Sequence, residues 1–373
     1  MRLLSALLHL IWGLLLALSG DRASAQSLPP SPYRNLVLEG GGIRGIAYGG
    51  ALQELERQGV LPKIERVGGT SAGAIQAALL AVGYSPDEII AVVNATPVQR
   101  LNDGRFIFFG GSHRLVKQYG WFRGDQLTTY LSELVGRQTQ RPDLTLGELH
   151  ALAQQRPAPG AAGRFRDLYV TGTNLTTQRM QVFSYETSPD LRVADAVRIS
   201  MSIPLYFRAV LLDAQNHVIT GKPAPGQPVQ VLVDGGLLAN YPIDLFDYPR
   251  YLPTSAGLSI PTPLVQGKVF NPETLGLRLD RAEQIPLDTA AAGRQQLAPY
   301  QIQDFSSYVG ALYTVALENL NPVQPADWRR TVSINILGFS PKIKRVSDAQ
   351  KQQLMDSGRE GVRAFLKLND KRK

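Results

Sequence analysis

The chain has 373 residues, of which 44% are hydrophobic and 19% are charged, close to the averages for globular proteins. This balance excludes a disordered tail protein, a collagen-like fibre and a multi-span membrane protein. The formal net charge of +8 is modest and spread along the chain, so it suits an anionic membrane without requiring one. Because the sequence contains no cysteine, no disulfide can stabilise the fold.

The first 25 residues have the pattern of a signal peptide. Arg2 gives a positive start, residues 3–18 are mostly apolar, and Ala23-Ser24-Ala25 supplies small residues before a cleavage position. An uncleaved membrane anchor is the alternative, but the apolar run is shorter than the roughly 20 residues that a spanning helix needs. We therefore expect a protein that is exported, to the periplasm or outside the cell.

The mature chain begins with two repeats of strand, glycine-rich turn and helix. Residues 34–38 and 64–67 are short apolar runs, and the helical patterns at 46–56 and 74–82 follow them. Residues 85–88, Ser-Pro-Asp-Glu, start a further helix with a cap, a proline in the first turn and acids near the positive end of the helix dipole. This order predicts an α/β fold with a mostly parallel sheet.

The rest of the chain continues this alternation with longer connections. Residues 100–125 are rich in glycine, phenylalanine and arginine, so we expect a loop there. The later predicted elements are helices at 126–135, 193–200, 289–319 and 347–367, strands at 168–173, 180–183, 229–233, 274–279 and 331–337, and a long loop at 251–268. We find no internal repeat and no low-complexity block.

Gly69-Thr70-Ser71-Ala72-Gly73 lies between a predicted strand and a helix, which is the arrangement of a nucleophile elbow. The serine of such a turn has a strained backbone, so the positions two before and two after it must lack bulky side chains. Gly69 and Gly73 occupy these positions. A glycine-rich turn with an incidental serine is the alternative, but the strand before it and the helix after it favour a nucleophile.

Gly40-Gly41-Gly42-Ile43-Arg44-Gly45 follows the first strand and permits two interpretations. It fits G-x-G-x-x-G, whose amides bind the pyrophosphate of a dinucleotide, and Glu65 lies about 20 residues on, where an acid would bind the ribose. The same amides could form an oxyanion hole. The serine in the second glycine turn and the expected export favour the oxyanion hole. Arg44 would add positive charge near a head group or form a structural salt bridge.

Asp234-Gly235-Gly236 follows a wholly apolar strand, where a carboxylate can accept a serine proton and glycines permit close approach. Such a motif alone is usually only a turn. Only His113, His150 and His217 remain after the predicted signal peptide, and none follows Asp234, as the α/β-hydrolase triad order requires. The sequence therefore favours a dyad of Ser71 and Asp234.

In their order and context, these three glycine motifs together resemble those of the patatin-like phospholipases. Ser200-Met201-Ser202-Ile203-Pro204 with Phe207 is also similar to a serine-rich stretch of that family. The resemblance covers residues 34–248 and implies a three-layer α/β/α sandwich with a mostly parallel central sheet. Glu39 departs from the aspartate of many relatives, and we expect little effect from this difference.

The resemblance also implies a function, a serine lipid acyl hydrolase with phospholipase A-like esterase activity and no metal or other cofactor. The implied site residues are Ser71 as nucleophile, Asp234 as general base, an oxyanion hole from Gly40, Gly41, Gly42, Arg44 and Gly45, and the motif glycines Gly69, Gly73, Gly235 and Gly236. A lipid or phospholipid is the expected substrate, an anionic membrane surface is a candidate partner, and no nucleic acid is expected. A non-catalytic lipid- or nucleotide-binding module on the same scaffold is the alternative.

These expectations divide the chain into three regions: a signal peptide at 1–25, the patatin-like domain at 34–248, and a C-terminal region at 249–373 that completes the sheet or flanks it.

The predicted loop at 100–125 mixes aromatic rings with cations: Phe106, Phe108, Phe109, Trp121, Phe122, Arg105, Arg114, Lys117 and Arg123. Rings beside cations suit a lipid interface. The alternative is that the rings fill the core and the cations are solvated.

Overall fold

The computed structural model describes residues 32–96, 101–104, 109–155, 163–252, 267–319, 325–340 and 346–370. The predicted signal peptide lies outside these residues, so it stays a prediction. Among the described helices, none combines the length and the apolarity that crossing a membrane requires.

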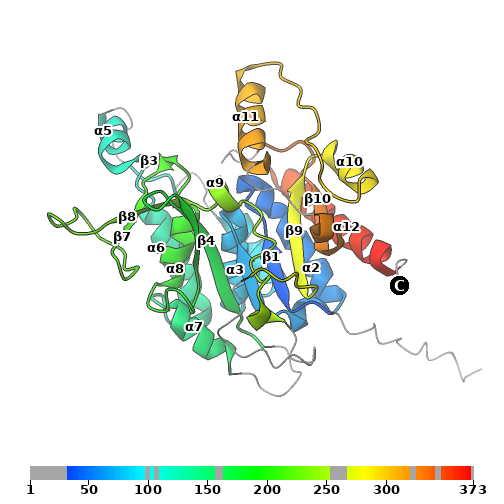
Figure 1. Ribbon diagram of the computed structural model, residues 1–373, viewed down its shortest axis with the longest axis horizontal. Helices are drawn as coiled ribbons and strands as arrows, with labels where there is room; N and C mark the ends of the chain where they lie inside the picture. The colour runs from blue at the N-terminus through cyan, green and yellow to red at the C-terminus, as the bar shows by residue number, and fades with distance from the viewer. Residues whose placement is uncertain are drawn as a thin grey trace, which may run out of the picture. The chain divides into compact units, whose positions relative to one another are not determined.

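A mixed sheet forms the centre of the described chain, in the strand order β10-β9-β1-β2-β4-β8-β7, with β5 also paired with β4 (Figure 1). The strands that run parallel to one another are β10 (Thr331–Asn335), β9 (Thr274–Asp280), β1 (Asn35–Leu38), β2 (Arg66–Gly69) and β4 (Asp167–Asn174). The antiparallel strands are β5 (Arg179–Phe183), β8 (Gln230–Asp234) and β7 (Val210–Leu212). The predicted α/β class with a mostly parallel sheet is therefore confirmed.

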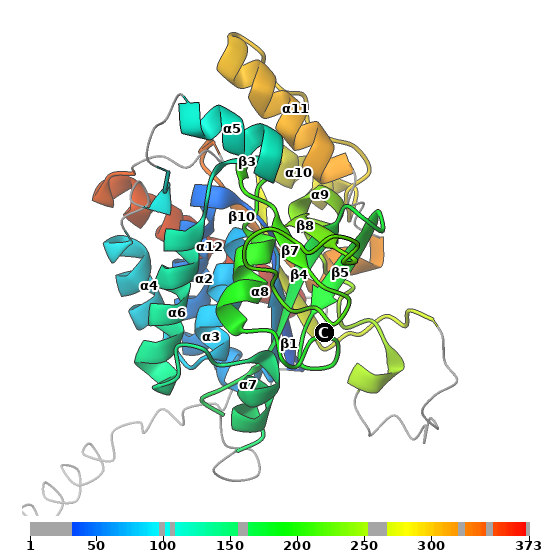
Figure 2. The ribbon, with the colours of Figure 1, turned by 90° about the vertical axis from the view of Figure 1, so that its left-hand side faces the viewer.

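One face of the sheet is covered by a layer of helices, which Figure 2 shows on one side of the strands. These helices are α2 (Ala47–Arg57), α3 (Ala72–Ala81), α4 (Pro86–Ala95), α6 (Asp125–Thr139), α7 (Leu146–Ala153), α8 (Val193–Ser200) and α12 (Asp348–Asp370). Because successive side chains of a strand point to opposite faces, Leu36 and Leu38 join the main core with these helices. Val37 points the other way, to a smaller core with Leu245 and Phe246.

Local signals explain why several of these helices begin where they do. The predicted start of α4 is confirmed as a reciprocal cap: the Glu88 amide donates to Ser85 Oγ at 3.3 Å, and the Ser85 amide donates to Glu88 Oε2 at 2.8 Å. The predicted helix at 193–200 is confirmed as α8 with the same bounds. Capping and apolar spacing are local properties, which is why the sequence predicts them well.

Two expectations about secondary structure were wrong. Residues 100–125 contain α5 (Phe109–Gln118) and β3 (Gly120–Phe122), which pairs with β6 (Leu205–Phe207). The composition suggested a loop, but Gly111 serves packing within α5, because a Cβ there would lie 2.6 Å from the Trp121 ring. The predicted helix at 289–319 is split into α10 (Gln284–Ala290) and α11 (Phe305–Asn319), since Ala292 and Gly293 have positive φ values of 49° and 154°.

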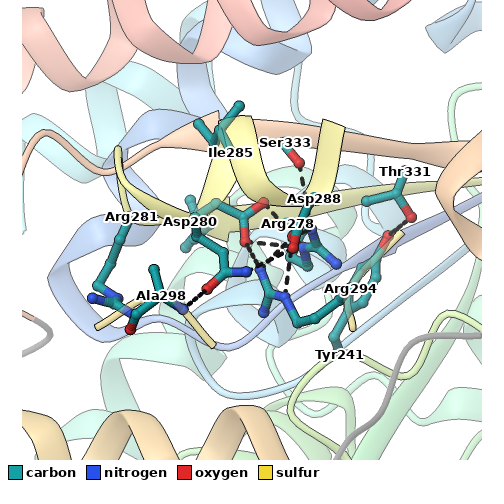
Figure 3. Close-up of polar contacts among 12 residues, drawn as sticks. Tyr241, Arg278, Asp280, Arg281, Ile285, Asp288, Arg294, Ala298, Thr331 and Ser333 are labelled. Carbon is teal, nitrogen blue, oxygen red and sulfur yellow. Dashed lines mark hydrogen bonds and ion pairs between the residues drawn. The ribbon is translucent and has the colours of Figure 1, made fainter. Parts of the chain in front are cut away.

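The C-terminal region contributes β9 and β10 to the sheet, and a buried ion-pair network attaches α10 to the end of β9 (Figure 3). Arg278 and Arg294 each contact Asp280 and Asp288, and all four side chains are less than a tenth exposed. Burial opposes ionisation of Asp280, but the two guanidinium groups lower its pKa. Two cations and two anions balance, so no net charge is left without compensation.

We predict that Asp288→Ala destabilises the fold by about 3–5 kcal/mol, because it leaves a buried positive charge unpaired. The measurement is urea unfolding followed by circular dichroism. A matched control is Asp348→Ala, which removes an ion pair with Lys351 from a side chain that is 98% exposed and should change stability little. A loss below about 1 kcal/mol for Asp288→Ala would show that the network does not hold this region.

Candidate active site

The site forms where two strands meet end to end along one edge of β4. The amide of Asp167 donates to the carbonyl of Glu65, just before β2, at 3.0 Å, and the amide of Leu175 donates to the carbonyl of Val231, in β8, at 2.8 Å. Successive amides of a strand point to opposite edges, so amides an even number of residues apart point to the same edge. β2 and β8 therefore lie one after the other along a single edge of β4.

The two strands run toward each other, because β2 is parallel to β4 and β8 is antiparallel to it. Gly69, the last residue of β2, pairs with Val170, and Asp234, the last residue of β8, pairs with Gly172. The carboxyl ends of β2 and β8 thus converge within about two residues of β4. This topology brings Ser71 and Asp234 together although 163 positions separate them in the sequence.

Ser71 has the strained backbone that a nucleophile elbow needs, with φ 53° and ψ −122°. A non-glycine residue in such a region costs of order 1–3 kcal/mol. Both flanking glycines are required sterically: a Cβ at Gly69 would lie 2.6 Å from the carbonyl carbon of Gly73, and a Cβ at Gly73 would lie 2.3 Å from the carbonyl oxygen of Leu38. The surrounding backbone therefore holds the turn so tightly that the strain persists.

Threonines anchor the elbow to β4 and to the turn after β8. The Thr70 hydroxyl donates to the carbonyl of Ala239 at 2.7 Å and lies 2.6 Å from the Thr171 hydroxyl. Thr70 has only one hydroxyl proton, so Thr171 donates the second hydrogen bond. Gly235 permits this close approach, since a Cβ there would lie 2.4 Å from Thr171 Oγ1.

The end of α8 connects the two candidate residues of the dyad. The Ser71 amide donates to Ser200 Oγ at 2.8 Å, and the Ser71 hydroxyl lies 3.6 Å from the sulfur of Met201. The Asp234 amide donates to the carbonyl of Ser202 at 2.9 Å. The serine-rich stretch that the sequence singled out therefore fixes the backbones of Ser71 and Asp234 on one rigid support.

Asp234 is buried, with 6% of the residue exposed, and its carboxyl group is only partly satisfied by hydrogen bonds. Its Oδ1 accepts a hydrogen bond from the Gly236 amide at 2.7 Å, whereas the buried Oδ2 has no partner among the described residues. Burial raises the pKa of Asp234 to about 7, and the Gly236 amide and the nearby Ser71 hydroxyl oppose that rise. A carboxylate with such a pKa is a much stronger base than an ordinary aspartate.

The glycine loop after β1 lies beside the elbow, since a Cβ at Gly40 would lie 3.3 Å from the Cβ of Ser71. The Gly40 amide donates to the carbonyl of Asn240 at 2.9 Å, so it is engaged in holding the loop. The amides of Gly41 and Gly42 have no hydrogen-bond acceptor in the described part of the chain. Gly42, at φ 55°, starts η1 (Gly42–Ile46), whose first amides lack intrahelical partners.

Arg44 and Gly45 support this loop from within η1. Arg44 is 8% exposed, and its Nε donates to the carbonyl of Gly41 at 3.1 Å. It forms no ion pair with an acidic side chain among the described residues, so it acts as a brace for the loop rather than as a salt bridge. A Cβ at Gly45 would lie 3.1 Å from the Cβ of Ala72, which keeps the loop and the elbow close together.

Sequence reasoning missed Asn240 and the clamp that it forms with Glu39. Asn240 Nδ2 donates to Glu39 Oε1 at 3.1 Å and to the Gly40 carbonyl at 3.2 Å. Glu39 Oε2 accepts the amide of Leu279, in β9, at 2.7 Å, and the Leu279 side chain fills the space in which a Cβ of Gly41 would lie. Glu39 thus ties the glycine loop to β9, a role that its position before the glycines did not reveal.

The three histidines that follow the predicted signal peptide lie away from Ser71 and Asp234. His150 pairs with Asp167, at the start of β4, with 2.7 Å between Nδ1 and Oδ1, and stacks on Tyr185. His217 pairs with Asp213, and His113 is exposed on α5. Within the described residues none contacts Ser71 or Asp234, which leaves the carboxylate as the base nearest to the serine.

Glu65 argues against the dinucleotide interpretation of the glycine loop. It lies just before β2, where it pairs with Arg34, just before β1. Both residues are therefore at the amino ends of their strands. The glycine loop follows the carboxyl end of β1, at the opposite edge of the sheet, so Glu65 cannot bind a ribose whose phosphates lie on that loop.

The fold and the elbow define an α/β protein with a serine at a strand–helix turn. A family model for patatin-like phospholipases matches residues 36–247. The chain belongs to the patatin-like phospholipase family, which confirms the resemblance seen in the motifs.

Relatives support this assignment. The chain is 32% identical to the uncharacterized protein YqhO of Bacillus subtilis over 228 residues. The aligned region covers 59% of this chain and 69% of that protein. It is 28% identical over 220 residues to the probable lipid hydrolase 463L of invertebrate iridescent virus 6, covering 59% of this chain and 65% of that protein. The crystal structure of VipD from Legionella pneumophila shares the fold, with a TM-score of 0.52, 18% identity, and coverage of 91% and 67%.

We predict that Asp234→Asn makes the protein more stable than the wild type above pH 7. The folded pKa of Asp234, about 7, exceeds the ordinary value of 3.8, so its ionisation destabilises the native state progressively as the pH rises from about 4 to 7. The increase in the free energy of unfolding, relative to the wild type, should be near zero at pH 4 and at most about 4 kcal/mol at pH 8. Urea unfolding at both pH values measures it.

Asp213→Asn is the matched control, because a hydrogen bond from the backbone of His217 lowers the pKa of that partly exposed aspartate. This variant should gain no stability at pH 8. A difference between Asp234→Asn and wild type that stays constant from pH 4 to pH 8 would mean that the pKa of Asp234 is not raised.

Proposed function

We propose that the chain is a serine lipid acyl hydrolase that uses Ser71 and Asp234 as a catalytic dyad. The observation that carries the proposal is the meeting of β2 and β8, which sets a strained, hydroxyl-bearing turn beside a buried carboxylate whose pKa is about 7. Family membership and a relative named as a probable lipid hydrolase support a lipid ester as the substrate.

The proposed reaction has two halves. Ser71 Oγ attacks the ester carbonyl carbon while its proton passes to Asp234, and the tetrahedral intermediate then expels the alcohol, which takes that proton. Water attacks the resulting acyl-enzyme and gives a proton to Asp234, and the second intermediate releases the acid as Ser71 regains its proton. Each half leaves Asp234 ionised again, so one carboxylate serves both.

The negative charge of both intermediates would lie near the amides of Gly41 and Gly42. Fixed amide donors stabilise such a charge without reorganising during the reaction, and losing one donor typically costs about 10²–10³ in rate. Among the glycines and the arginine that the motif suggested, these two amides are the ones that other groups leave available. Gly40, Arg44 and Gly45 would act by shaping the loop.

A predicted consequence is that Ser71→Ala and Asp234→Asn each lower kcat/KM for a p-nitrophenyl ester by at least about 10²-fold, as general-base loss typically does. The double variant should be no worse than either single one, because the two residues act as a unit. Wild-type kcat/KM should rise with pH to a plateau above about 7, where Asp234 is ionised.

Replacing His113, His150 and His217 together by glutamine is the control and should leave most of the activity. If Asp234→Asn kept more than about a tenth of the rate, the dyad would be the wrong assignment. A collapse of activity in the histidine variant would point to a triad instead.

We also propose that an anionic lipid surface binds at the end of the molecule where the site lies. α9 (Gly236–Ala239) directly follows the Asp234 turn and contacts α11, and Figure 2 shows α5 and α11 at the same end. Large apolar side chains are exposed there, with Phe305 80% and Leu312 54% exposed on α11 and Val116 70% exposed on α5.

The aromatic and basic segment at 100–125 contributes only in part. Phe122 packs on the main core, as the alternative interpretation held, but Arg114 is buried and donates to the carbonyl of Trp121, so this cation is not solvated. Lys117, on α5, and Arg123, directly after β3, are exposed, and in this proposal they face the anionic phosphates. Phe106, Phe108 and Arg105 lie outside the described residues, as does the side chain of Phe109.

Co-sedimentation with vesicles tests this surface. Binding should rise with the anionic lipid content and fall with salt, because salt screens surface charge. Phe305→Ser with Leu312→Ser should weaken binding about tenfold or more, since both apolar side chains stop inserting. Met180→Ser, at an exposed position on β5, is the control and should bind as the wild type does. Unchanged binding of the α11 double variant would refute the proposal.

A further inference from the structure

A cavity of about 780 Å³ adjoins the elbow and is not part of the dyad itself. Its wall includes Gly42 and Gly45 of the glycine loop and Ala72, the residue after Ser71. Protein interiors contain few voids larger than a water molecule, whereas ligand sites occupy roughly 300–1,000 Å³. The cavity therefore has the size of a binding site rather than of a packing defect.

The cavity extends away from the elbow, between α3 and α6. Apolar residues on successive turns of these helices line it: Ala72, Ile75, Leu79, Leu127, Leu131 and Leu134. At 1.5 Å per residue, the distance along α3 from Ala72 to Leu79 is about 10 Å. A long, narrow, apolar ligand fits such a wall, because it gains from burial along its whole length.

Several polar residues of the wall lie where α4 ends and α12 begins, and protein groups satisfy them. Gln76 of α3 also lines the cavity, and its buried Oε1 has no hydrogen-bond partner among the described residues. Lys351 Nζ donates to the Asn94 carbonyl at 3.3 Å and contacts Asp348 Oδ1 at 3.1 Å. The Thr96 hydroxyl donates to the Val92 carbonyl at 2.7 Å. Because the groups near α4 and α12 are bonded to one another, a ligand would mainly contact the apolar stretch along α3 and α6, with Gln76 as a polar position on α3.

We infer that this cavity receives the acyl chain of the substrate and that Ile75 and Leu79 set the chain length that fits. The inference rests on the proposed function. An acyl group on Ser71, with its carbonyl oxygen at the Gly41 and Gly42 amides, would begin its chain at the end of the cavity that Ala72 lines. The chain would then pass Ile75 about one helical turn below the elbow and Leu79 about one turn further down.

The test compares kcat/KM for p-nitrophenyl butyrate, octanoate and palmitate. Leu79→Trp fills the part of the cavity far from Ser71. Its kcat/KM for the palmitate ester should fall at least tenfold, while its kcat/KM for the butyrate and octanoate esters should stay at the wild-type level. Ile75→Trp fills the cavity nearer the elbow. Its kcat/KM should fall at least tenfold for the octanoate ester as well as for the palmitate ester and stay at the wild-type level for the butyrate ester. About two methylenes excluded from burial suffice for a tenfold loss.

Leu80 provides the matched control, because it is buried on the same helix and does not line the cavity. Leu79→Ala lengthens the cavity and should raise kcat/KM for the palmitate ester relative to kcat/KM for the octanoate ester. Leu80→Ala should destabilise the fold to a similar degree but leave the dependence of kcat/KM on chain length unchanged. Thermal unfolding of each variant separates a folding defect from an altered profile, and Leu79→Phe is a milder block if the tryptophan variant does not fold.

A binding measurement keeps this inference distinct from the proposed function. Fluorescence of cis-parinaric acid, a long-chain fatty acid, should report binding to Ser71→Ala protein and its loss in Ser71→Ala with Ile75→Trp. If the wild type hydrolyses none of the esters yet binds this probe through the cavity, the proposed function fails and the cavity assignment stands. If folded Ile75→Trp and Leu79→Trp keep the wild-type profile and the wild-type binding, the inference is overturned.

Discussion

The end-to-end meeting of β2 and β8 along one edge of β4 is the constraint on which the site depends. Each strand is held to β4 by its own ladder, so their carboxyl ends have fixed positions, and the residues that follow them must turn away sharply. Glycines at 69, 73 and 235 make those turns possible, because backbone or hydroxyl atoms occupy the space of any side chain. The meeting of Ser71 and Asp234 is therefore a product of topology.

This arrangement stores unfavourable free energy at the site. Ser71 has a strained backbone, and Asp234 is a buried carboxylate with an oxygen that no described group satisfies. Both features persist because the surroundings are rigid: Thr70 and Thr171 bond across the turn, the end of α8 holds both backbones, and the Glu39–Asn240 clamp ties the glycine loop to β9. The buried network of Arg278 and Asp288 in turn attaches α10 to β9.

The sequence predicted the features that are local. The α4 cap, the α8 bounds and the alternation that builds a parallel sheet follow from spacing and capping, and the glycine motifs identify Ser71 and Asp234 as candidates. The Asn240 clamp and the bond from the Ser71 amide to Ser200 depend on contacts between distant segments, so no local pattern reveals them. The break before α11 was missed because an Ala-rich run has high helix propensity, and its tertiary setting overrides that propensity.

The central claim is that Ser71 is a nucleophile activated by Asp234. Labelling with a fluorophosphonate followed by mass spectrometry of the modified peptide tests it most directly. We expect one modified residue, Ser71, with a labelling rate that rises with pH through about 7 and is lost in Asp234→Asn. Modification of another serine, or equal labelling of Asp234→Asn and wild type, would contradict it.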